Sequence, residues 1–82
     1  LHSFTFSVYP NPATTVLNIV PETQYEEVDI IMTDLQGKVS YQQHFSVISE
    51  SVLIEADRFS PGIYLVQITS KNDRFLKKVV VQ

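Results

Sequence analysis

The chain has 82 residues, of which 44% are hydrophobic, 18% charged and 11% aromatic, so it is long enough for one small domain. Its formal net charge of −3 argues against nucleic-acid binding, and the absence of Cys excludes a disulfide framework and a thiolate metal site. No apolar run approaches the roughly 20 residues that a membrane-spanning helix needs. Because the chain begins with Leu1 and not with Met, we expect residues 1–82 to be a single domain from a longer protein.

The first half of the chain contains short runs in which apolar and polar residues alternate, as in strands with one buried face. These runs cover residues 4–8, 16–20, 27–33 and 39–45, and in the last of them Val39 is assigned to the same face as Tyr41 and Phe45. The two prolines that flank Asn11 predict a turn or a crossing between sheets. Asp34 and Gly37 predict a hairpin loop, since Asp bonds to nearby backbone amides and Gly adopts positive φ.

The second half continues the same pattern after one interruption. Residues 52–56 alternate, whereas residues 57–62 do not and predict a helical or turn-like loop that packs Phe59 against the end of the core. Two further strands, residues 63–69 and about 74–81, are joined by a polar tip. Seven short runs without an amphipathic helix predict an all-β, immunoglobulin-like antiparallel β-sandwich, with a small closed barrel as the competing architecture.

The last two predicted strands are apolar on both faces, although one face of a two-sheet sandwich normally meets water. If Tyr64 and Val79 point inward, an apolar stripe is left pointing outward. Exposed apolar residues rimmed by charge often mark docking surfaces. The alternative is a β-bulge or a covering loop. We therefore interpret the stripe as a candidate docking surface for a carrier protein; it consists of Ile63, Leu65, Leu76, Lys78 and Val80.

Other groups of residues give weaker indications of a metal site or a catalytic site. Glu22, Glu26, Glu27 and Asp29 are acidic, but their spacing follows a strand and favours a solvated face over a calcium loop. His2 and His44 have no third ligand nearby in the sequence, so zinc is not expected. A serine hydrolase would need a nucleophile elbow and a pocket, and neither is indicated. We expect no cofactor, no metal and no catalysis.

Three turn motifs and the C-terminal residues occur together in an order that resembles one known family. The positions that carry the resemblance are Tyr9, Pro10, Asn11, Pro12, Asp34, Gly37, Lys38, Gly62, Tyr64, Lys78 and Val79. Along the whole chain they resemble the C-terminal sorting domain of proteins exported by the type IX (Por) secretion system of Bacteroidetes. The chain departs mildly from that pattern at Phe59, where many members carry Leu.

This resemblance implies a sandwich of seven strands at the end of a secreted cargo protein. It implies that the domain directs its cargo through the periplasm and across the outer membrane, to the cell surface or the medium. The implied partners are an outer-membrane carrier and a surface sortase that removes the domain. The last two strands are implied to be the most important portion, which here corresponds to Gly62, Tyr64 and the stretch through Lys78, Val79 and Val80.

Two alternatives remain open at this stage. The chain could be an immunoglobulin-like accessory module that binds carbohydrate or protein on a larger secreted enzyme, for which Tyr9, Tyr25 and Tyr41 are the candidate platform. Asn11 could be read by the export machinery or could only shape its turn. Independently, an unpaired edge strand could accept a partner strand or pair two copies, so we expect some homodimer when the domain is isolated.

Overall fold

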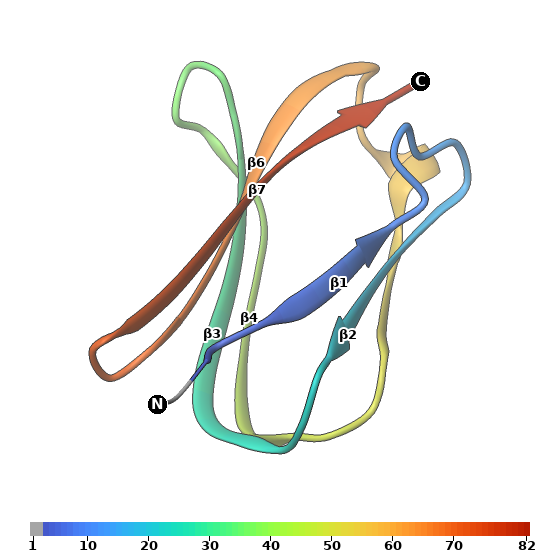
Figure 1. Ribbon diagram of the computed structural model, residues 1–82. Helices are drawn as coiled ribbons and strands as arrows, with labels where there is room; N and C mark the ends of the chain where they lie inside the picture. The colour runs from blue at the N-terminus through green and yellow to red at the C-terminus, as the bar shows by residue number, and fades with distance from the viewer. Residues whose placement is uncertain (1–2) are drawn as a thin grey trace.

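The computed structural model describes residues 3–82, which form seven strands and one short 3-10 turn (Figure 1). No helix within that range is long and apolar enough to cross a membrane. The elements are β1 (Phe6–Tyr9), β2 (Val16–Pro21), β3 (Tyr25–Asp34), β4 (Val39–Ile48), β5 (Val52–Glu55), the turn η1 (Ala56–Arg58), β6 (Gly62–Ser70) and β7 (Asp73–Val81).

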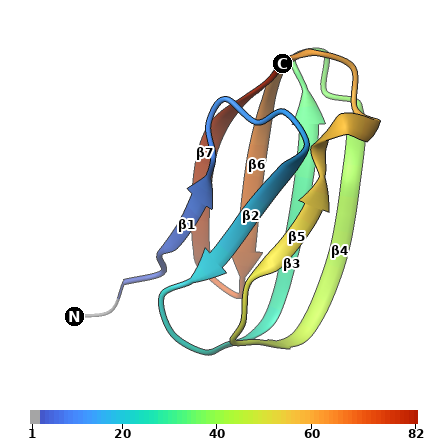
Figure 2. The same cartoon turned by 90° about the vertical axis from the view of Figure 1, so that its right-hand side faces the viewer.

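The strands form two antiparallel sheets that face each other (Figure 2). One sheet has the order β1-β2-β5 and the other has the order β4-β3-β6-β7. The expectation of an all-β, immunoglobulin-like sandwich is confirmed. A closed barrel is excluded, because β1, β5, β4 and β7 each lie at the edge of a sheet.

The core lies between the sheets and is built by the alternation seen in the sequence. Along most of the strands the side chains of every second residue point inward, and the outward positions between them are polar or partly exposed. Burial of these apolar side chains is the main force that holds the sheets together. The buried set is Phe6, Ala13, Leu17, Ile19, Val28, Ile30, Met32, Ile48, Ile54, Ala56, Tyr64, Val66, Ile68, Val79 and Val81.

The segment after β1 crosses from one sheet to the other, as the two prolines predict. Ala13 makes a parallel bridge with Val81 of β7. The amide of Ala13 donates to the carbonyl of Val80 at 2.8 Å, and the amide of Gln82 donates to the carbonyl of Ala13 at 2.9 Å. The N-terminal crossing therefore closes the last part of the β7 edge (Figure 1).

The loop between β3 and β4 confirms the predicted turn chemistry. The Asp34 carboxylate accepts hydrogen bonds from the amides of Gln36 and Lys38, both at 2.9 Å. Gly37 has φ of +87°, which a residue with a Cβ rarely adopts. The loop after β5 also behaves as predicted, since η1 leads into Phe59, which packs against the core.

The prediction that Val39 lies on the inward face of β4 is wrong. Val39 does not share the inward face of Tyr41 and Phe45, because the register between β3 and β4 shifts at Met32/Thr33. Val39 pairs with Thr33 and its side chain is 50% exposed. A β-bulge adds one residue to one strand and thereby reverses the face of every residue beyond it.

Candidate docking surface

The β6–β7 hairpin carries the candidate stripe, and its register decides which side chains share a face. Strands β6 and β7 pair from Gly62 with Val81 to Ser70 with Asp73, without a bulge. Ile63 lies opposite Val80, and Leu65 lies opposite Lys78. Unbroken pairing keeps all five predicted docking residues on the outer face of the four-stranded sheet.

The outer-face side chains are only partly covered. The exposed fractions are 39% for Ile63, 38% for Leu65 and 44% for Leu76, while Val80 is half-buried and Lys78 is exposed. No loop of residues 3–82 closes over Ile63, Leu65 or Leu76. The stripe is thus an accessible apolar surface with a cation beside it, a composition that is typical of protein contacts.

Two of the positions that carry the family resemblance, Tyr64 and Val79, lie on the inward face of the same hairpin. Tyr64 is 6% exposed, and its hydroxyl donates to the carbonyl of Ser60 at 2.6 Å. Its ring lies 5.8 Å from that of Phe59, measured between centroids. Val79 is fully buried opposite Tyr64. Tyr64 and Val79 therefore anchor the hairpin, and they are inaccessible to a docking partner.

Asn11 binds the edge of β7 with its side-chain amide. Its Nδ2 donates to the carbonyl of Lys78 at 3.0 Å, and its Oδ1 accepts from the amide of Val80 at 3.0 Å. The amide group thus imitates one residue of a neighbouring strand. These contacts give Asn11 a structural role that the sequence did not indicate, since it reaches across to the last strand. Pro10 and Pro12 flank it, and Tyr9, 50% exposed, precedes it.

Two acidic residues of β3 contact His44 on the outer face, and the sequence analysis did not predict this contact. Nδ1 of His44 lies 2.8 Å from Oδ1 of Asp29, and Nε2 lies 3.3 Å from Oε2 of Glu27. The hydrogen bond to Asp29, followed by the charge of both carboxylates, raises the pKa of His44. The register Asp29 with His44 could have suggested this pair once the strands were aligned.

No cluster of metal-ligating side chains is assembled within residues 3–82. The two nitrogens of His44 face different carboxylates, and no group of three metal-ligating side chains occurs in the described part of the chain. His2 lies outside the described residues. The Asp34 carboxylate is bonded to the amides of its own turn, whereas His44 contacts Asp29 and Glu27.

The three tyrosines proposed as a sugar platform do not gather on one surface. Tyr25 packs against Phe4 at 4.9 Å and bonds through its hydroxyl to the backbone of Ser3 and Thr5. Tyr41 packs against the core from β4, and burial raises the pKa of its phenol. Only Tyr9 of the three is exposed, so the accessory-module reading loses its main support.

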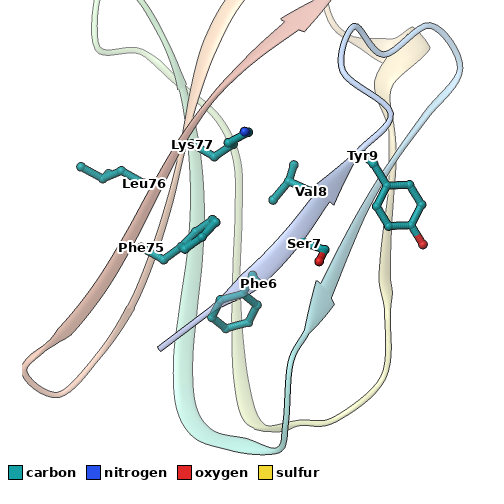
Figure 3. Close-up of a pocket in the computed structure, with 7 residues that line it drawn as sticks. All are labelled: Phe6, Ser7, Val8, Tyr9, Phe75, Leu76 and Lys77. Carbon is teal, nitrogen blue, oxygen red and sulfur yellow. The ribbon is translucent and has the colours of Figure 1, made fainter. Parts of the chain in front are cut away.

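A groove between the edges of β1 and β7 was also not expected from the sequence. It has a volume of about 530 Å³ and is lined by residues 6–9 of β1 and 75–77 of β7. Figure 3 shows Phe75 and Lys77 reaching from β7 toward β1, while Leu76 points away to the outer face. Strand β7 therefore contributes to two surfaces, the groove and the stripe, and Leu76 takes part in both.

Comparisons with known proteins agree with the resemblance seen in the sequence. The family described as secretion system C-terminal sorting domain matches residues 7–82. No curated protein matches the chain. A similar solved structure is that of PorZ, an essential bacterial surface component of the type-IX secretion system of Porphyromonas gingivalis. It has 22% identity and a TM-score of 0.76, and the match covers 94% of this chain but only 11% of PorZ.

Proposed function

Because the chain belongs to the family of type IX secretion system C-terminal sorting domains, we propose that it acts as a non-catalytic tag read by a carrier protein at the outer membrane. In this family the domain is the secretion signal of a larger protein that is exported to the surface or the medium. The cargo passes through the periplasm, docks to the carrier and loses the tag to a surface sortase.

The observation that carries this proposal is the accessible apolar stripe on the outer face of β6 and β7. Hydrophobic burial contributes roughly 25 cal/mol per Å², so a contact that covers about 200 Å² of such surface is worth about 5 kcal/mol. The costs of association offset part of this contribution, and what is left favours an exported protein that carries the stripe over one that lacks it. Lys78 at its centre, opposite Leu65, adds a charge that limits which partner surface fits.

The proposal is tested by fusing residues 1–82 to the C terminus of a neutral reporter in a host with the export system. Leu65→Ser combined with Leu76→Ser should lower surface delivery roughly tenfold and leave the reporter in the periplasm. The matched control is Val47→Ser combined with Leu53→Ser. Those two side chains are 51% and 59% exposed and lie on other strands.

The control separates the stripe from apolar surface in general. Both variants must first be shown to unfold at the same temperature as the parent domain. Normal delivery of the folded Leu65 and Leu76 variant would contradict the stripe as the docking surface. An intact wild-type fusion that stays in the periplasm would contradict the sorting function as a whole and favour an accessory binding module.

A further inference from the structure

The edge of β7 is closed at one end and open at the other. Asn11 and Ala13 bond to backbone amides and carbonyls of Lys78, Val80 and Gln82. The even-numbered residues of β7 therefore point their amide and carbonyl groups away from β6. The same alternation turns the amides and carbonyls of Arg74 and Leu76, and the amide of Lys78, toward the free edge. No segment within residues 3–82 pairs with these groups.

The open part of this edge borders the groove between β1 and β7 (Figure 3). Phe6 and Phe75 approach each other across its floor, with ring centroids 5.6 Å apart. Lys77 follows on the same side of β7 as the buried Val79, yet its side chain is exposed. The groove thus combines an apolar floor, unpaired backbone groups and one cation.

Lys77 has no counter-ion in the described part of the chain. No ion pair between described residues includes Lys77; those of His44 and Arg58 lie elsewhere in the fold. Although the chain carries a net charge of −3, four of its six basic residues lie in the β7 hairpin, namely Lys71, Arg74, Lys77 and Lys78. Residues 71–78 carry these four basic side chains and one carboxylate, Asp73, so this end of the hairpin is net positive on an acidic protein.

A second copy of the chain is a poor match for this site. Antiparallel pairing of two β7 strands about Leu76 would bring Arg74 of one copy beside Lys78 of the other, and like charges directly opposite are destabilising. The other edge strands do not supply a free carboxylate. β1 and β4 contain none, and the only one in β5, Glu55, bonds to Arg58 at 3.0 Å. The charge therefore favours a different, acidic partner.

We propose that residues 74–78 of β7 accept an extended acidic segment of a partner protein as an added strand, with Lys77 pairing with one of its carboxylates. Backbone bonds to Leu76 and Lys78 supply affinity, and alternate side chains of the added strand reach the groove. Asn11 ends the open edge at Lys78 and so sets the register. The proposal rests on the sorting function, because the partner is taken to belong to the export machinery.

The test is amide hydrogen exchange of the isotopically labelled 82-residue chain, followed by NMR. The probe is a nine-residue peptide that alternates Asp with Val, and its control carries Asn in place of Asp. Saturating acidic peptide should slow exchange of the Leu76 and Lys78 amides at least tenfold. Lys77→Gln should weaken binding about fivefold, as for an exposed ion pair. Lys38→Gln, in the distant β3–β4 loop, should leave binding unchanged.

Three results would overturn strand addition. These are unchanged exchange at Leu76 and Lys78 under saturating peptide, equal affinity for the neutral control, and equal effects of the two lysine substitutions. Protection in the chain alone, rising with its own concentration, would instead assign the edge to a second copy. The sorting function fails separately, when the wild-type reporter fusion is left in the periplasm, so the two proposals can be told apart.

Discussion

Replacing Asn11 with Ala tests how the N-terminal crossing secures the last strand. The change removes both side-chain contacts, 3.0 Å to the carbonyl of Lys78 and 3.0 Å to the amide of Val80. It leaves the flanking prolines and the bridge between Ala13 and Val81 in place. The variant therefore isolates the amide group from the rest of the crossing.

The size of the effect follows from the exposure of these bonds. A net contribution of roughly 0.5–1.5 kcal/mol is usual for one hydrogen bond, and groups that return to water cost less than groups left buried. Both bonds lie at an exposed edge, so their joint loss should lower the free energy of unfolding by about 1–2 kcal/mol. For a domain of this size that corresponds to a fall of roughly 5–15 °C in Tm.

Thermal unfolding followed by circular dichroism measures the loss, and hydrogen exchange locates it. The Val80 amide should exchange faster in Asn11→Ala, whereas amides in the centre of β3 should change only by the global loss of stability. Asn18→Ala is the matched control, because its side chain makes one longer contact, 3.4 Å to the carbonyl of Tyr9. A Tm within about 1 °C of wild type, with unchanged exchange at Val80, would refute the reasoning.

The remaining predictions concern three other contacts. Tyr64→Phe should cost about 1 kcal/mol in urea unfolding, because its hydroxyl bond to Ser60 is lost while the ring stays buried. The pKa of His44 is raised above its ordinary value of 6.5, so its stabilising contribution is complete below that pH and is lost as pH rises through the folded pKa. Tm should therefore decline from pH 6 to 8 in wild type more than in His44→Gln; equal slopes would contradict the pairing with Asp29. Sedimentation of the isolated domain should show dimers formed through β4, whose edge carries no carboxylate, and Gln43→Lys should abolish them. A monomer at millimolar concentration would contradict this.

Much of the fold could be predicted from the sequence, because strands and turns depend on patterns of neighbouring residues. Alternation identified the strands, Asp34 and Gly37 identified a turn, and the order of the motifs identified the family. The parity of β6 and β7 also pointed to the outward stripe, since an unbroken hairpin keeps every second residue on one face. Whether a carrier reads that stripe remains a prediction.

What the sequence alone determined is therefore the set of strands, their turns and the faces of most side chains, because these depend on neighbours along the chain. The tertiary structure decided the rest. A bulge moved Val39 to the outer face, and the approach of the two sheets brought Asn11 to Lys78, 67 positions away. It also left Lys77, which has no ion-pair partner within residues 3–82, at the wall of an open groove that Phe6 lines as well. Contacts of this kind depend on which strands become edges and how the sheets pack, and no local pattern encodes that choice.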